Sequence, residues 1–123
     1  MIVDSSALLS ILFAEPNATW AANQLNLHGN SLRMSTVNLA EVLIRLRDRF
    51  PSRGDEFELT LAESGIEFVP PDALQAQLAA RARLALPLNL GDCFAYALAR
   101  VTSDSILTTD ADFRGLDVPV ILP

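Results

Sequence analysis

Short hydrophobic runs alternate with longer segments of helical periodicity along the whole chain. The short runs cover residues 1–3, 32–34, 66–69, 105–108 and 118–122, and their apolar and β-branched content is typical of strands. Between them, hydrophobic residues recur at helical spacing over residues 8–13, 18–27, 36–49, 54–64, 72–86 and 91–101. Strands that alternate with helices predict an α/β domain with a mainly parallel sheet of four or five strands flanked by helices.

Length and composition favour one folding unit, and we predict a single domain over residues 1–123. Half of the 123 residues are hydrophobic, which is enough for a substantial core, and no linker or repeat divides them. The single cysteine cannot form an internal disulfide, and no basic start precedes a cleavable apolar segment, so we expect a cytoplasmic protein. The apolar stretch at residues 7–14 is far shorter than the roughly 20 residues that span a bilayer, so no membrane segment is expected.

The chain is acidic, with 15 acidic residues, nine basic residues that are all arginine, and a formal charge of −6. Nucleic-acid binders usually carry a basic excess, because lysine and arginine neutralise phosphates. A cluster of carboxylates that holds divalent ions would nevertheless inflate the negative charge of the free chain. The net charge therefore does not exclude a nucleic-acid substrate.

Four acidic residues stand where predicted strands give way to helices or loops: Asp4, Glu41, Asp92 and Asp110. The carboxyl ends of parallel strands meet at one edge of a sheet, so carboxylates that are far apart in sequence can meet there. They would repel one another unless a cation lay between them. Oxygen ligands favour Mg²⁺ or Mn²⁺, whereas a zinc site would need more than the lone Cys93 and the lone His28.

Each acidic residue also has a purely structural explanation. Asp4 and Asp92 are typical helix-capping residues, and Asp110 is a typical turn former. Glu41 is spaced for an ion pair with Arg45 on the same helix. The joint placement of the four acids is therefore stronger evidence for a site than any one of them.

Four segments, in this order, resemble the PIN domain, and in particular the small VapC-type toxins of bacterial toxin–antitoxin pairs. They are VDSSALL, STVNLAEVL, LNLGDCFAYALA and ILTTDADF, and the resemblance covers essentially the whole chain. It implies a catalytic, metal-binding quartet with one auxiliary acid: Asp4, Glu41, Asp92 and Asp110, with Asp112 beside them. Ser6 and Thr108 match the small hydroxyl positions that accompany the first and last acids.

The resemblance implies a single-domain PIN fold and an endoribonuclease that depends on Mg²⁺ or Mn²⁺, in which a metal-activated water hydrolyses an RNA phosphodiester. It also implies a homodimer and a cognate antitoxin protein that joins it in a hetero-oligomer. Within this interpretation, Asp4 and Asp92 are inner metal ligands. Glu41 and Asp110 complete the site directly or through water.

Arginines near the same edge are the candidates for RNA contact. Arg45 and Arg49 follow Glu41 at four-residue spacing, so they share a helix face and are predicted to bind phosphates that flank the cleavage site. The alternative is that Arg45 only pairs with Glu41 and Arg49 is only solvent-exposed. Asn38, one turn before Glu41, is a candidate for positioning a water molecule, but a helix-start role is the simpler interpretation.

Several other functions are weighed against this one. The chain has no P-loop, and its lack of lysine argues against phosphotransfer enzymes of the receiver and haloacid dehalogenase types. A housekeeping RNA-processing PIN nuclease and a PIN-fold binding protein without catalysis remain as alternatives. The helix predicted at residues 36–49 carries more apolar surface than one core-facing stripe, which favours burial of part of it in a second subunit.

Overall fold

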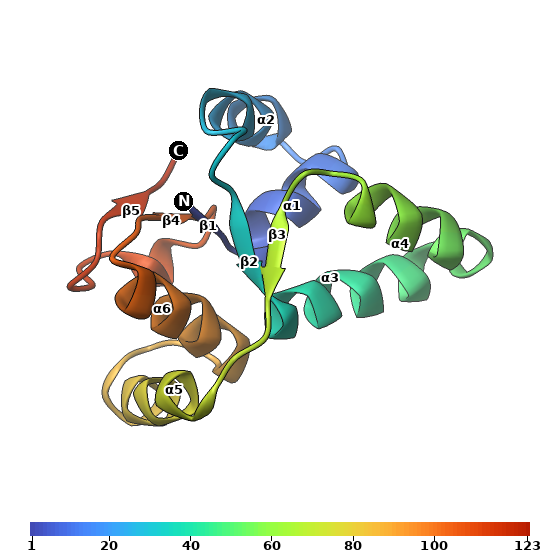
Figure 1. The fold of residues 1–123 in the computed structure, drawn as a ribbon. Coiled ribbons are helices and arrows are strands. Elements are labelled where there is room, and N and C mark those ends of the chain that lie inside the picture. Colours follow the sequence, from blue (N-terminus) through green and yellow to red (C-terminus); the bar gives the residue numbers. More distant parts are fainter.

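Five short parallel strands form the centre of the structure, a computed structural model that describes residues 1–123 (Figure 1). Each neighbouring pair of strands is parallel, and the order across the sheet is β3-β2-β1-β4-β5. The prediction of a mainly parallel sheet is therefore confirmed. The strands are β1 (Ile2–Val3), β2 (Arg33–Ser35), β3 (Glu67–Val69), β4 (Ile106–Leu107) and β5 (Val120–Ile121).

Helices flank the sheet and agree in number and position with the predicted helical segments. Local signals explain their ends: the Ser35 hydroxyl accepts a hydrogen bond from the Val37 amide at the start of α3, and Pro51 follows its end. The α-helices are α1 (Ser5–Leu12), α2 (Ala18–Leu27), α3 (Thr36–Arg49), α4 (Gly54–Ala62), α5 (Ala73–Ala85) and α6 (Leu90–Thr102). Two short 3₁₀ helices are η1 (Pro51–Arg53) and η2 (Ala111–Phe113).

Side chains of the central strands alternate between two hydrophobic cores. Val3 and Leu107 contribute to the core that includes residues of α1, α3 and α4, whereas Ile2 and Ile106 contribute to the core built with α5 and α6. All four side chains are fully buried. Because both faces of the sheet are covered, these strands appear in the sequence as continuous hydrophobic runs rather than as alternating patterns.

The strand order places a crevice at the carboxyl edge of the sheet. The chain passes from β1 to β2 and β3 on one side, and then crosses through α5 and α6 to β4 on the other side of β1. The segments that follow the adjacent strands β1 and β4 therefore lead away toward opposite sides of the sheet. Open α/β sheets bind ligands in the crevice between two such segments. Asp4 follows β1, and Asp110 comes shortly after β4.

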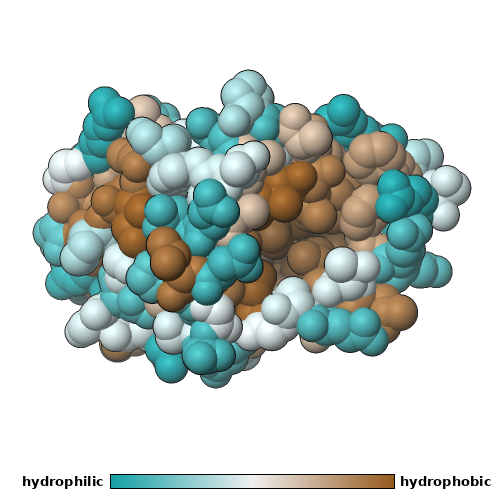
Figure 2. Space-filling model, turned by 90° about the horizontal axis from the view of Figure 1, so that it is seen from above, coloured by the Kyte–Doolittle hydropathy of each residue, from teal (hydrophilic) through white to brown (hydrophobic).

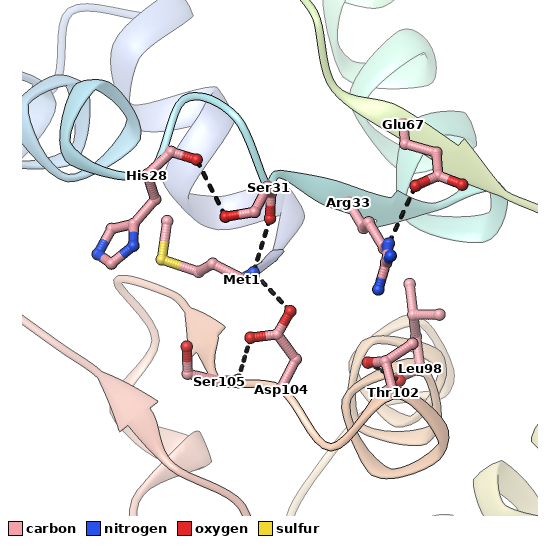
Figure 3. Close-up of polar contacts among 9 residues, drawn as sticks. All are labelled: Met1, His28, Ser31, Arg33, Glu67, Leu98, Thr102, Asp104 and Ser105. Carbon is pink, nitrogen blue, oxygen red and sulfur yellow. Dashed lines mark hydrogen bonds and ion pairs between the residues drawn. The ribbon is translucent and has the colours of Figure 1, made fainter.

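Polar contacts fix the opposite edge of the sheet (Figure 3). The amino group of Met1 donates hydrogen bonds to the carbonyl oxygen of Ser31 at 2.8 Å and to Oδ2 of Asp104 at 2.5 Å. Arg33 and Glu67 form an exposed ion pair between β2 and β3. These contacts tie together the segments that lead into the central strands.

A hydrophobic hollow lies in the half of the molecule into which α3 and α4 extend (Figure 2). A cavity of about 450 Å³ lies between α3, α4 and β3, and its lining includes Leu39, Leu43, Leu61 and Phe68. On the outside of α3, Ile44 is 67% exposed. None of the helices is both long and apolar enough to cross a membrane.

Candidate active site at the carboxyl edge of the sheet

The fold brings Asp4, Glu41, Asp92 and Asp110 into electrostatic contact. Asp4 caps the start of α1, Asp92 lies in the first turn of α6, and Asp110 precedes η2. Glu41 lies in the second turn of α3. The charges of the other three residues all raise the pKa of Asp92, which shows that they share one region. Capping by Asp4 and the early-helix position of Asp92 are therefore compatible with a place in this acidic cluster.

Asp4 is the most deeply buried of the four acids, with 1% of its surface exposed. Its Oδ2 accepts hydrogen bonds from the hydroxyls of Ser6 at 2.6 Å and Thr108 at 2.9 Å. Its Oδ1 is buried and has no hydrogen-bond partner. Burial raises the pKa of Asp4, and the charge of Glu41 adds to the shift, whereas the hydrogen bonds from Ser6 and Thr108 oppose it. A buried acceptor without a partner is costly, and Oδ1 is free to bind a ligand from outside the chain.

The two predicted hydroxyl residues connect Asp4 to the segment that carries Asp110. The Ser6 hydroxyl accepts a hydrogen bond from the Thr109 amide at 3.1 Å, and the Thr108 hydroxyl accepts one from the Asp110 amide at 3.0 Å. Since both hydroxyls donate to Asp4, the loops after β1 and β4 are held in one fixed arrangement.

Glu41 is held by neighbours that sequence reasoning did not assign to it. Its Oε1 accepts hydrogen bonds from Asn38 Nδ2 at 2.9 Å and from the Ser5 hydroxyl at 3.3 Å. The alternative ion pair with Arg45 is not formed, because no ion pair of the structure includes Glu41. The interpretation of Asn38 as a helix-start residue is wrong, because Ser35 caps α3 and the Asn38 side chain reaches across to α6.

Asp92 belongs to a capping box with Asn89. The Asn89 amide donates to Asp92 Oδ2 at 3.2 Å, and the Asp92 amide donates to Asn89 Oδ1 at 2.9 Å. Asp92 is only 7% exposed. Burial, followed by the charge of Asp4, raises the pKa of Asp92 to about 7, although the hydrogen bond from Asn89 opposes the shift. This carboxyl group therefore gains or loses its proton near neutral pH, well above the range of an ordinary aspartate.

The four carboxylates share one bonding pattern. One oxygen of each accepts a hydrogen bond from the protein, and the other oxygen accepts none. No arginine or amino group forms an ion pair with any of them. The free oxygens, the burial and the mutual repulsion suit a hard divalent cation such as Mg²⁺ or Mn²⁺. In the present arrangement, no three of the acidic side chains lie close enough together to hold a metal ion between them.

The structure gives Asp112 a more peripheral place than the quartet. Its side chain is exposed, and its backbone amide donates to Oδ1 of Asp110 at 2.9 Å. The contact at the site is thus made by the backbone of Asp112, while its carboxylate lies at the outer margin.

Arg45 and Arg49 lie on the outer face of α3 and stack on phenyl rings. The guanidinium carbon of Arg45 lies 5.5 Å from the centre of the Phe13 ring, and that of Arg49 lies 4.5 Å from the same ring. Arg53 continues the row over Phe57 at 4.7 Å. Stacking of this kind restrains the guanidinium groups. Arg45 and Arg49 form no ion pair, so both charges are available to an anionic ligand.

Comparison with known proteins identifies the family. The PIN domain model matches residues 1–119. Ribonuclease VapC of Mycolicibacterium smegmatis is 35% identical over 130 residues, which cover 98% of this chain and 99% of that protein. Ribonuclease VapC42 of Mycobacterium tuberculosis is 36% identical over 128 residues, with 96% of each chain covered.

Solved structures share the fold at lower sequence identity. VapC20 of Mycobacterium tuberculosis, described as a sarcin–ricin loop cleaving toxin, aligns with a TM-score of 0.84 at 15% identity and covers 99% of this chain and 98% of that one. A chain of a toxin–antitoxin complex from Klebsiella pneumoniae aligns with a TM-score of 0.77 at 20% identity, covering 98% and 94%. From the family match and the VapC relatives with more than 30% identity, we conclude that this chain belongs to the PIN-domain family, in its VapC group.

Proposed function

We propose that this protein is an endoribonuclease that requires Mg²⁺ or Mn²⁺ and acts as the toxin of a toxin–antitoxin pair. The observation that carries the proposal is the set of four coupled carboxylates, each with one oxygen held by the protein and one oxygen left free. The names of the VapC relatives, which are ribonucleases, support the same substrate class.

In this proposal, the inner metal ligands are Asp4 and Asp92, because they are the most buried of the four acids and have the greatest need of a counter-ion. Glu41 and Asp110 complete the site directly or through water, and Asp112 is auxiliary. A bound divalent ion would activate a water molecule toward phosphorus and stabilise the charge on the leaving oxygen. Ser6 and Thr108 keep Asp4 in one orientation, which leaves Oδ1 as its ligand atom.

Binding of the ion should also release a proton from Asp92. Since the pKa of Asp92 is about 7 in the metal-free protein, a ligand that needs the ionised carboxylate displaces a proton from it near neutral pH. Metal affinity should therefore rise with pH through this range. Calorimetric titration with Mn²⁺ in buffers of different ionisation enthalpy measures the protons released.

Arg45 and Arg49 are proposed to hold the RNA backbone beside the cleavage site. They lie about 6 Å and 12 Å from Glu41 along the axis of α3, at a rise of roughly 1.5 Å per residue. Replacing both with alanine should weaken RNA binding and reduce its dependence on salt, because each phosphate contact contributes to that dependence. Arg33→Ala serves as the control, since Arg33 pairs with Glu67 at the opposite edge.

Cleavage of RNA by the purified protein tests the central proposal. We expect cleavage in Mn²⁺ or Mg²⁺, loss of cleavage in EDTA, and at least a hundredfold loss in Asp4→Asn and Asp92→Asn, with Glu67→Gln as a matched exposed control. Equal cleavage by the wild type and Asp92→Asn would refute the assignment. RNA binding without cleavage in any divalent ion would instead support a PIN-fold binding protein.

Growth assays separate a toxin from a housekeeping nuclease. Expression of the protein alone should arrest growth, Asp4→Asn should not, and co-expression of a small antitoxin from a neighbouring reading frame should restore growth. Growth that is unaffected by the active enzyme would favour the housekeeping function. We propose that the antitoxin covers the hydrophobic cavity between α3, α4 and β3, where apolar side chains lie open.

A homodimer is proposed from the exposed side of α3 that carries Ile44, which lies about 100° around the helix from Arg45. Val42 and Leu46 of this helix are buried in the core, whereas Ile44 is 67% exposed. Light scattering at micromolar concentration should show a dimer, and Ile44→Glu should produce a monomer because it places a charge in the contact. A wild-type monomer under these conditions would contradict the proposal.

A further inference from the structure

We propose that Asn38 is a positioning residue that orients the Glu41 carboxylate against the start of the helix that carries Asp92. The inference rests on the metal-dependent site proposed above, and it concerns a residue that does not bind the metal itself. Asn38 lies on α3, and its side chain is fully buried.

The amide nitrogen of Asn38 connects α3 to α6. It donates one hydrogen bond to Glu41 Oε1 at 2.9 Å and a second to the carbonyl oxygen of Gly91 at 3.0 Å. Gly91 directly precedes Asp92. One side chain therefore touches one acidic residue and the backbone next to another, and no other side-chain hydrogen bond joins these two helices.

Gly91 allows the close approach that this contact needs. A Cβ atom at residue 91 would overlap the Glu41 carboxylate. The carboxylate thus lies directly against the start of α6, with Asn38 and Ser5 as its hydrogen-bond donors. Asn38, Ser5 and Gly91 therefore fix the position of the carboxylate. Of its two hydrogen-bond donors, only Asn38 also donates to α6.

Stability gives an asparagine at this position no clear advantage, because the two hydrogen bonds that its amide donates are offset by its own unsatisfied oxygen. The Oδ1 atom of Asn38 is buried and has no hydrogen-bond partner, which destabilises the folded state. An apolar side chain of similar size would fill the space without leaving this acceptor unsatisfied. What such a side chain lacks is the N–H group that holds Glu41. Outer partners of this kind orient metal ligands, and their loss commonly lowers metal affinity by roughly 10–100-fold.

Titration with Mn²⁺, followed by calorimetry, tests this role without measuring activity. We expect Asn38→Ala and Asn38→Leu to bind Mn²⁺ roughly 10–100-fold more weakly than the wild type. The urea midpoint of Asn38→Leu in EDTA should stay unchanged or rise. Gln75→Ala is the matched control, because Gln75 is also a buried amide with an unpartnered oxygen but makes no hydrogen bond to the four carboxylates. Its Mn²⁺ affinity should equal that of the wild type.

Two further variants distinguish positioning from a general structural effect. In a Glu41→Gln background, Asn38→Ala should cause no additional loss of Mn²⁺ affinity, because its effect passes through the missing carboxylate. Gly91→Ala should fold, since the flexible end of Glu41 can move aside, and it should weaken Mn²⁺ binding by displacing that carboxylate. This variant and Asn38→Leu carry the test if Asn38→Ala does not fold.

The possible results separate this inference from the proposed function. Wild-type Mn²⁺ affinity in both Asn38 variants would overturn the role of Asn38 and leave the metal site intact. Additive losses in the Glu41→Gln background would also overturn it. If the wild type binds no Mn²⁺, the metal site itself is refuted, and the role of Asn38 with it.

Discussion

Asp92→Asn should make the metal-free protein more stable at pH 7.5, even though it removes a residue of the proposed active site. The reason is that Asp92 is 7% exposed and lies among the charges of three other acids. Asparagine removes the charge but keeps an oxygen that can accept the hydrogen bond from the Asn89 amide, so the start of α6 is preserved.

The size of the effect follows from the pKa of Asp92. In the unfolded chain this group ionises near its ordinary value of 3.8, whereas in the folded protein it holds a proton up to about pH 7. Between these values the folded state binds one more proton, so stability falls as the pH rises. At 1.36 kcal/mol per pH unit, the full difference is about 4 kcal/mol, of which about 2 kcal/mol falls between pH 5 and pH 7.

Shifted groups outside the acidic edge leave this pH range clear. The raised pKa of Asp4 acts in the same direction as that of Asp92. The pKa of Asp104 is lowered despite its partial burial, because the Met1 amino group donates a hydrogen bond to it, and that contribution is lost only below about pH 4. The decline between pH 5 and pH 7 therefore reports the acidic edge.

Urea unfolding in EDTA at pH 5, 6, 7 and 7.5 is the assay. Wild-type stability should fall by about 2–3 kcal/mol across the series, which corresponds to roughly 10 °C in Tm for a domain of this size. Asp92→Asn should lose most of this dependence, and the exposed Asp112→Asn should retain it. At pH 7.5, Mn²⁺ should stabilise the wild type and leave Asp92→Asn unchanged. The reasoning is refuted if wild-type stability does not fall with pH, or if Asp92→Asn is the less stable protein at pH 7.5.

Three further substitutions probe the surroundings of the site. Thr108→Val keeps the shape of the side chain but removes the hydrogen bond to Asp4, so the metal-free protein should lose about 1–2 kcal/mol in urea unfolding; an unchanged midpoint would contradict the role of this bond. Phe13→Leu removes the ring on which Arg45 and Arg49 stack, so KM for RNA should rise roughly two- to fivefold while kcat is kept, and an unchanged KM would show that the stacking does not matter. Leu98→Ala should cost about 2–5 kcal/mol by opening a cavity in the core beneath α5 and α6, with no change in Mn²⁺ affinity; a loss of affinity would show that this core also shapes the site.

Most of the secondary structure could be predicted from the sequence, because local chemistry determines where each helix and strand begins and ends. The helix predicted at residues 36–49 agrees with α3 because a serine cap and a following proline define its ends. The central strands β1 and β4 were predictable because a strand that is buried on both faces is a continuous hydrophobic run, whereas β3, with its exposed Glu67, was predictable from its alternating pattern. The four acidic residues could also be picked out from the sequence, because each stands just after a strand or early in a helix.

Tertiary structure decided the contacts of each residue at the site. Spacing within α3 allowed an ion pair between Glu41 and Arg45, but in the folded protein Phe13 of the α1 end lies beneath Arg45, and Ser5 and Asn38 hold Glu41. The bond from Asn38 to Gly91 joins residues 53 positions apart, a pairing that only the packing of α3 on α6 creates.

The sequence by itself thus determined the elements, their approximate ends and the acidic residues at the strand ends, because these depend on periodicity and on neighbours within one turn. Only the tertiary structure decided which oxygen of each carboxylate is held, that burial and three neighbouring charges raise the pKa of Asp92 to about 7, and that Asn38 links two helices. Those properties depend on desolvation and on contacts between distant segments, and neither exists until the sheet and its helices have packed together.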